Sequence, residues 1–207
     1  MSFTAVRNIV GATALLAASF SSQASLIVNG DFEMNPVNPG NWAVFNSNHV
    51  AGWQGSNIEI WNAMNGVLAV SGDNFIELNA HGANSGKWYI FQDFATEIGK
   101  AYQLSFFYRA RNNNERFDIS VAGLSQTLSD HNNLGWTLFS SVFVATDSLS
   151  RLGFTSQNAS TTGNFIDNVQ VSALPSPAVA VPEPVSLAAF GLGLLALVGG
   201  RRLGRNK

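Results

Sequence analysis

Acidic, amide and indole side chains alternate with apolar ones in two short runs of the chain. In "NIEIWN" and "NFIELNA", Glu59, Trp61, Glu77 and Asn79 are interleaved with isoleucine and leucine. Indole rings stack on the apolar face of a sugar, while carboxylate, amide and guanidinium groups bond its hydroxyls. A few placed polar groups among apolar walls are typical of a ligand site. These runs predict a carbohydrate-binding face.

The alternation of a β-strand decides which of these side chains share that face. Successive side chains of a strand point to opposite sides of a sheet. We assign the isoleucines and leucines of both runs, and alternate residues of "LSFFYRAR", to the core. In "WYIFQDF" we place Trp88 and Gln92 on the outer face, and Tyr89 and Phe91 on the opposite one. The predicted ligand-binding residues are Glu59, Trp61, Glu77, Asn79, Trp88, Gln92, Arg109 and Arg111.

Other interpretations of this face stay open. Outward Glu and Arg residues on neighbouring strands could form cross-strand pairs on a solvated surface. Trp61 and Trp88 could be covered by loops and belong to a secondary core. We expect Trp53, in the "GW" pair, to be packed, and Trp136 to lie in the core or at its rim.

Hydrolysis is an alternative to simple binding. A glycoside hydrolase needs two carboxylates roughly 5–9.5 Å apart on either side of the sugar bond, and Glu59 and Glu77 could supply them. The chain has neither the HExxH spacing, nor a GxSxG elbow, nor a cysteine nucleophile. Its histidines, His49, His81 and His131, lie in Asn/Gly-rich sequence. The sequence therefore favours a protein without catalytic activity.

The segments that position these residues are short, aromatic and β-branched, and clusters of Gly, Asn, Asp and Ser separate them. There are seven such runs, of which "NFIELNA" is the first and "FIDNVQV" the last. Several short strands at this spacing predict an all-β domain, a jelly-roll β-sandwich over residues 25–174. About 150 residues are enough for a single core.

Asp167 in "FIDNVQV" has the same strand parity as Val169 and Val171, so we expect it to point inward. A buried carboxylate is costly unless it is paired, hydrogen-bonded or bound to a metal. Two outcomes stay open: Asp167 caps a turn or accepts backbone N–H bonds, or it binds calcium, which prefers carboxylate and carbonyl oxygens.

Both ends of the chain are typical of targeting signals. Arg7 is followed by "IVGATALLAASF" and "SSQAS", which predicts a signal peptide with a helical core over residues 1–24. A Pro/Ala linker, 175–181, precedes the tail 182–207. Its uncharged run 185–200 would span roughly 24 Å as a helix, less than the ~30 Å of a bilayer core. Basic residues follow at once and favour the cytoplasmic side. We expect the tail to remain in the inner membrane only transiently.

Charge and cysteine content narrow the function classes. Between the two signals the chain has six basic and twelve acidic residues, a net charge near −6. This balance argues against nucleic acid, which requires a basic patch. The chain contains no cysteine, so an exported domain would depend on its core and not on disulfides.

The tail resembles a PEP-CTERM sorting signal. The resemblance rests on Pro182, Glu183 and Pro184, the apolar run, and Arg201 and Arg202. It implies a Gram-negative bacterium that makes extracellular polysaccharide, processing by an exosortase-type enzyme, and delivery to the cell surface or the extracellular matrix.

The central domain is similar to galactose-binding-like β-sandwich domains, the fold of many carbohydrate-binding modules. "LIVNGDFE", "GW", "FQDFAT" with "GKAYQLSFFYRAR", and "IDNVQV" occur in this order. They resemble most a domain-of-unknown-function family of plant cell-wall proteins and bacteria. The resemblance implies affinity for polysaccharide. It also implies a structural calcium ion, held by the side chains of Glu33 and Asp167 and the backbone carbonyl of Asp31.

Taken together, the sequence predicts an exported, non-catalytic carbohydrate-binding module that binds extracellular polysaccharide. The alternatives are a structural matrix or biofilm protein without specific glycan binding and, less favoured, a glycoside hydrolase.

Overall fold

The computed structural model describes residues 24–81, 88–113, 115–129 and 132–175. The predicted signal peptide, linker and sorting signal lie outside these residues, apart from the boundary residues 24 and 175. Within the described part, no helix has the length and apolar character needed to cross a membrane.

The described chain consists of β-strands with two short 3-10 turns, η1 (Ser47–His49) and η2 (Met64–Gly66). The strands are β1 (Asn41–Phe45), β2 (Gln54–Gly55), β3 (Ile58–Asn62), β4 (Asn74–Glu77), β5 (Tyr89–Ala95), β6 (Ala101–Arg109), β7 (Phe117–Val121), β8 (Leu124–Leu128), β9 (Thr137–Val144), β10 (Leu149–Ser156) and β11 (Phe165–Ala173).

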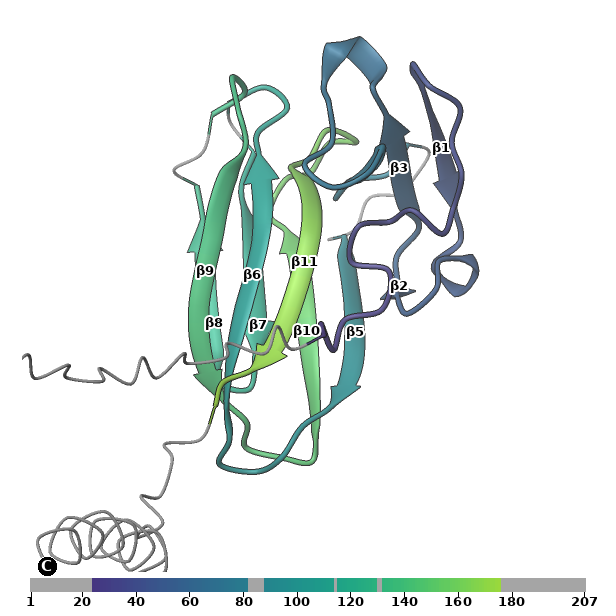
Figure 1. Ribbon diagram of the computed structural model, residues 1–207. Helices are drawn as coiled ribbons and strands as arrows, with labels where there is room; N and C mark the ends of the chain where they lie inside the picture. The colour runs from purple at the N-terminus through teal and green to yellow at the C-terminus, as the bar shows by residue number, and fades with distance from the viewer. Residues whose placement is uncertain (1–23, 82–87, 114, 130–131, 176–207) are drawn as a thin grey trace, which may run out of the picture.

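These strands form two sheets that lie one in front of the other in Figure 1. Sheet A has the order β1-β3-β4-β11-β6-β9, and sheet B has the order β2-β5-β10-β7-β8. The strands from β4 to β11 are divided between the sheets as β4-β11-β6-β9 and β5-β10-β7-β8, which is a jelly-roll arrangement. The predicted all-β two-sheet sandwich is confirmed.

Alternating apolar side chains of both sheets fill the space between them. On β6, Leu104, Phe106 and Tyr108 are buried, while the residues between them are partly exposed. The ring centroid of Phe106 lies 4.8 Å from that of Phe139 on β9 and 5.1 Å from that of Phe154 in sheet B. The isoleucines of β3 and β4 belong to the same core. The predicted parity is therefore right for β3, β4 and β6.

A second, smaller core lies on the outer side of sheet A. Trp61, Phe75 and Phe165 meet there with ring centroids 5.0 to 6.1 Å apart. Apolar side chains of segment 63–73 cover them, and the indole N–H of Trp136 donates to a carbonyl of that segment at 2.9 Å. Trp61 thus points outward from sheet A, as predicted, but a loop covers it and leaves it 2% exposed.

Strand β5 lies in sheet B, which corrects the predicted outer face. Trp88 and Gln92 are buried, while Tyr89 and Phe91 are half-buried on the side of sheet B that faces away from sheet A. The assignment of Trp88 and Gln92 to one outer face with Glu59 and Glu77 is therefore wrong.

Backbone groups explain why these two polar side chains lie inside. The side-chain amide of Gln92 accepts the N–H of Val28 at 2.7 Å and donates to its carbonyl at 3.0 Å. The indole N–H of Trp88 donates to the carbonyl of Asn57 at 3.0 Å. Buried backbone groups need such partners.

Strand β11 contains a bulge, which alters the position of Asp167. Its register against β6 shifts between Asp167 and Gln170, and Asn168 has a φ of 52°. The extra residue puts Asp167 opposite the outward Phe107 and out of phase with the valines that follow. The predicted inward direction is wrong. Asp167 is buried on the outer side of sheet A, where segment 63–73 supplies its hydrogen bonds.

Candidate functional site

Four of the predicted ligand-binding residues meet on the outer side of sheet A. A guanidinium nitrogen of Arg111 donates to both carboxylate oxygens of Glu77, at 3.0 and 2.9 Å. The same guanidinium lies 4.9 Å from the ring centroid of Trp61. The indole N–H of Trp61 donates to Oε1 of Glu59 at 2.6 Å. Their grouping follows from the pairing of β3 with β4, in which Glu59 and Glu77 are opposite each other.

These side chains bind one another and the backbone. Glu59 and Glu77 are 3% and 1% exposed. Glu59 also accepts the N–H of His81 at 2.6 Å, and Glu77 accepts the N–H of Gly163 at 2.8 Å. A sugar cannot reach carboxylates buried in this way, so the pair on which hydrolysis would depend is inaccessible. Their burial assigns Glu59, Trp61 and Glu77 to the support of the fold.

Asn79 supports a neighbouring loop. Its side chain is fully buried, and Nδ2 donates to the carbonyl of Ser160 at 2.6 Å and more weakly to those of Asn158 and Thr162. Together with the bond between Gly163 and Glu77, these contacts fix segment 157–163 against sheet A.

Arg109 is the remaining member of the predicted set on sheet A. Its guanidinium lies 6.0 Å from the ring centroid of Trp136 and donates to the carbonyl of Asn133. Burial lowers the pKa of Arg109. Trp88 and Gln92 belong to sheet B, so the structure does not bring them to this group.

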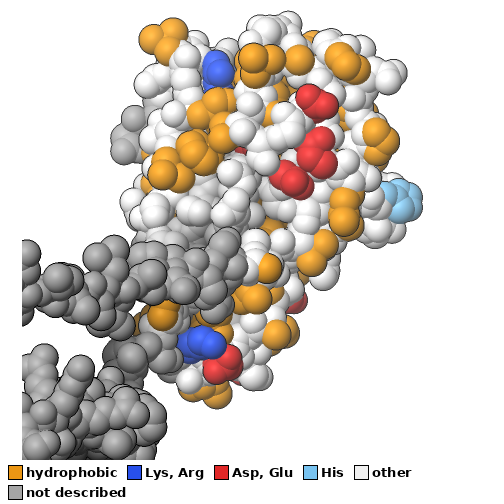
Figure 2. All heavy atoms as spheres, in the orientation of Figure 1, with side chains coloured by type: hydrophobic (Ala, Val, Ile, Leu, Met, Phe, Trp, Pro, Cys, Tyr) orange, Lys and Arg blue, Asp and Glu red, His pale blue; other side chains and the backbone are white. Residues whose placement is uncertain are grey.

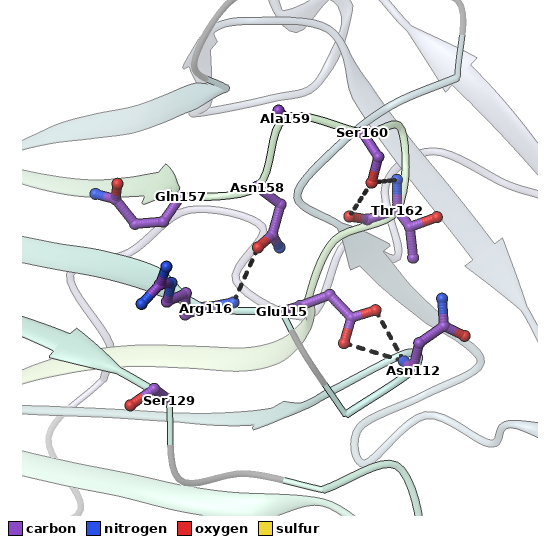
Figure 3. Close-up of a pocket in the computed structure, with 9 residues that line it drawn as sticks. All are labelled: Asn112, Glu115, Arg116, Ser129, Gln157, Asn158, Ala159, Ser160 and Thr162. Atoms are coloured by element: carbon purple, nitrogen blue, oxygen red, sulfur yellow. Dashed lines mark hydrogen bonds between the residues drawn. The ribbon is translucent and has the colours of Figure 1, made fainter.

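Segment 157–163 forms one wall of a hollow at the end of sheet B, which Figure 3 shows. The hollow has a volume of about 610 Å³. Amides of Asn112, Gln157 and Asn158 and the charged groups of Glu115 and Arg116 line it, and the rest of the lining is serine, threonine and one alanine. It is an open polar site, and it contains none of the predicted ligand-binding residues.

Hydrogen bonds orient the lining before any ligand arrives (Figure 3). Both carboxylate oxygens of Glu115 accept the backbone N–H of Asn112, at 2.9 and 3.0 Å. Oδ1 of Asn158 accepts the backbone N–H of Arg116 at 3.3 Å. Binding to loops that are already ordered costs less conformational entropy.

Sequence reasoning missed this hollow because loops form it. Strand parity says nothing about residues between strands. The signal that could have found it is the clustering of small polar residues in "SQNASTTGN" and of amides in "RNNNER", each of which adjoins a predicted strand.

Of the predicted calcium ligands, Glu33 and Asp167 bind the same turn. Oε1 of Glu33 accepts the N–H groups of Asp73 and Asn74 at 2.8 and 2.6 Å, and Asp167 accepts two N–H groups earlier in the turn at 2.6 and 2.9 Å. Burial raises the pKa of Asp167 to about 7, and the charge of Glu33 acts in the same direction. Figure 2, which is viewed from the side of sheet A, shows acidic side chains gathered on the outer surface.

The donor set fits calcium only in part. Asp31 binds locally: its Oδ1 accepts the N–H of Glu33 at 3.5 Å. Among the described residues, no three His, Cys, Asp or Glu side chains converge as a metal site would require. Calcium binds carboxylate oxygens, so Glu33 and Asp167 would suit it if backbone carbonyls completed its coordination shell. The alternative that Asp167 accepts backbone N–H bonds is confirmed.

Residues 25–172 match the family model described as "Protein of unknown function (DUF642)". The chain belongs to this family. The match covers the four sequence motifs of the central domain, so its resemblance to a domain-of-unknown-function family is confirmed. No curated protein matches the chain.

Solved structures similar to this DUF642 protein include carbohydrate-binding modules. A CBM4 structure is 19% identical at a TM-score of 0.45 and covers 72% of this chain and 99% of its own. TmCBM61 in complex with β-1,4-galactotriose is 14% identical at 0.48, with 72% and 99% covered. The CBM22-1 xylan-binding domain of Paenibacillus barcinonensis Xyn10C is 11% identical at 0.43, with 76% and 100% covered. At these values, the likeness carries no information about a ligand of the DUF642 domain.

The buried Glu77 predicts a pH dependence of stability. Burial raises the pKa of Glu77 from 4.5 to about 8, although the N–H of Gly163 and Arg111 act in the opposite direction. The folded state then holds this proton more tightly than the unfolded state, so Glu77 lowers stability as pH rises from 4.5 to 8. We expect the stability of the Glu77→Gln variant to fall less than that of the wild type as pH rises over this range. The two changes should differ by about 1.4 kcal/mol or more, the equivalent of a tenfold difference in proton affinity.

Urea unfolding of the full-length chain at pH 5 and pH 8 measures this difference. Glu97→Gln is the matched control, because the Glu97 side chain is 74% exposed. If the Glu77→Gln and wild-type stabilities change in parallel with pH, the raised pKa is wrong.

Proposed function

We propose that the DUF642 domain is a non-catalytic carbohydrate-binding module of the cell surface or the extracellular polysaccharide matrix. The observation that supports this most directly is the hollow at the end of sheet B. Its lining combines amides and hydroxyls with one guanidinium and one carboxylate. Sugar hydroxyls both donate and accept hydrogen bonds, and these side chains offer both partners.

Affinity at this site should be modest for one copy. An open polar hollow buries little of a solvated sugar, so much of the binding energy is offset by lost freedom and desolvation. Many copies displayed on one surface would bind a polymer with several repeats far more tightly through avidity.

Delivery to the surface is the part of the proposal that rests on the sequence alone. The predicted signal peptide 1–24 would direct export, and the tail 182–207 would pause in the inner membrane for an exosortase-type enzyme. We expect protein recovered from the cell surface to begin near Ser25 and to lack the tail. Intact-mass measurement checks both ends. A cytoplasmic protein that keeps its first residues would contradict this delivery.

Glycan binding in the hollow predicts a loss of affinity when its polar groups are removed. Gln157→Ala and Arg116→Ala should each weaken binding roughly five- to tenfold, the effect of one hydrogen bond or charge-assisted bond. Gel electrophoresis of the full-length chain through gels that contain soluble polysaccharides measures this as restored mobility.

Gln170→Ala is the matched control, because Gln170 is exposed on sheet A. Unchanged mobility of the wild type with every glycan, together with self-association, would favour the structural matrix protein. Release of reducing ends would indicate hydrolysis.

Calcium is a second, separable part of the proposal. A cation between Glu33 and Asp167 would relieve the repulsion of two close carboxylates and would fasten the turn near residue 72 to β11. We expect added Ca²⁺ to raise the melting temperature of the full-length chain by at least about 3 °C over a chelated sample. Asp167→Asn should remove this response, while Asp147→Asn on a distant loop should keep it. If chelation leaves the melting temperature unchanged and no metal co-purifies, the calcium proposal is wrong.

A further inference from the structure

The outer face of sheet B continues the hollow along β10. Arg151, Gly153, Thr155 and Gln157 share one side of this segment, and Gln157 is also part of the hollow. From Arg151 to Gln157 the chain spans about 20 Å at roughly 3.3 Å per residue. A sugar chain of several units fits along such a distance.

An aromatic ring lies across the middle of this face. A Cβ atom at position 153 would be 2.7 Å from Cε2 and 3.0 Å from Oη of Tyr89, and 3.1 Å from Oγ of Ser120. Tyr89 therefore extends from β5 over Gly153 toward Ser120 on β7, and it occupies the space that a side chain would fill. Phe91 stacks on it, with ring centroids 5.3 Å apart. Because the guanidinium of Arg151 covers Phe91, the half-buried ring of Tyr89 is the platform on which the apolar face of a sugar could stack.

The polar groups beside the platform are already fixed. The guanidinium of Arg151 lies 3.8 Å from the ring centroid of Phe91 and forms two bonds to Asp93, at 2.7 and 2.8 Å. Between the platform and the hollow, Gln157 and Thr127 both donate to Asp118. A ligand would meet a preorganised surface, which reduces the entropy cost of binding.

This face carries no excess of positive charge. Arg151 is paired with Asp93, and Arg116 is outnumbered by the acidic residues Glu115 and Asp118. The residues between the two predicted signals have a net charge near −6. An anionic polymer would find no excess of positive charge here and would be repelled at long range.

We propose that the binding site runs from the hollow along β10 to Tyr89 and Phe91, and that its ligand is an extended, uncharged polysaccharide bound along its length. This inference rests on the proposed function and adds the platform and the ligand class to it. The Tyr89 platform supplies stacking, and the hollow supplies hydrogen bonds to hydroxyls farther along the same chain.

Ligand length and charge test the proposal. The full-length chain is run through gels that contain xylan, β-1,4-galactan or β-1,3-glucan as uncharged probes, and polygalacturonate or alginate as acidic ones. Oligosaccharides of the polymer that retards it most, from disaccharide to hexasaccharide, are then titrated by calorimetry. We expect an uncharged polymer to bind most tightly, and the affinity to rise at least tenfold from disaccharide to hexasaccharide.

Three variants address the platform. Tyr89→Ala removes the ring, and Gly153→Ala displaces it, because the added Cβ would come within 2.7 Å of it. Ser120→Arg places a long side chain on the outer face of sheet B, at an exposed position where the fold should tolerate it. Each should weaken hexasaccharide binding about tenfold and leave disaccharide binding in the hollow nearly unchanged.

Two controls match these variants on sheet A. Trp42→Ala removes a partly exposed aromatic ring, and Ser140→Arg adds the same side chain at an exposed position of β9. Both should bind as the wild type does, and melting curves confirm that every variant is folded. Because Ser120→Arg removes no packing, it keeps the test decisive if Tyr89→Ala unfolds.

The outcomes separate this inference from the proposed function. If no polysaccharide binds, the proposed function itself is wrong. If Gln157→Ala weakens binding while affinity is independent of ligand length and the platform variants bind normally, the hollow binds alone and the inference is overturned. Tighter binding of polygalacturonate or alginate would overturn the uncharged ligand class.

Discussion

The buried carboxylate of Glu77 joins the parts of the molecule on which the hollow depends. It lies on β4 and receives Arg111, which follows β6, and the N–H of Gly163, which precedes β11. Two residues on, Asn79 holds the carbonyl of Ser160 from the same side. Removing one partner of such a group leaves a buried charge unpaired, which is strongly destabilising. Segment 157–163, and with it one wall of the hollow, therefore has a single arrangement relative to both sheets.

Sequence alternation predicted the fold and the direction of the side chains on β3, β4 and β6, because the apolar residues of those strands fall mainly on one side. Ile58 and Ile60 on β3, and Leu104 and Phe106 on β6, admit only one phase if the core is to be filled. Strand β5 offers aromatic residues in both phases, so its phase depends on tertiary contacts. There the inward glutamine serves Val28, a partner 64 residues away in the chain that no local pattern reveals.

The candidate site was less predictable than the fold, for two physical reasons. A row of polar side chains on a strand has the same pattern whether water or a loop covers it, and segment 63–73 together with Arg111 and Trp136 buries the cluster around Trp61. One inserted residue exchanges the faces of a strand, and the bulge at Asn168 moves Asp167 in this way. The hollow depends on loop conformations, for which the sequence supplies polar composition but no geometry.

The outer sides of the two sheets consequently differ in how their polar groups are used. The outer side of sheet A uses Glu59, Glu77 and Arg111 on bonds within the protein, so these groups have little capacity left for a ligand. On the outer side of sheet B, Gly153 gives room to Tyr89, and the neighbouring side chains are small or tied to one another. We expect a surface of this kind to accept a flat, hydroxyl-rich polymer without rearrangement, because Glu77 and Asn79 of sheet A hold segment 157–163 and bonds among the lining residues hold the rest. The support and the proposed contact surface are then formed mostly by different residues, but a substitution of Glu77 or Asn79 would still reach the hollow through segment 157–163.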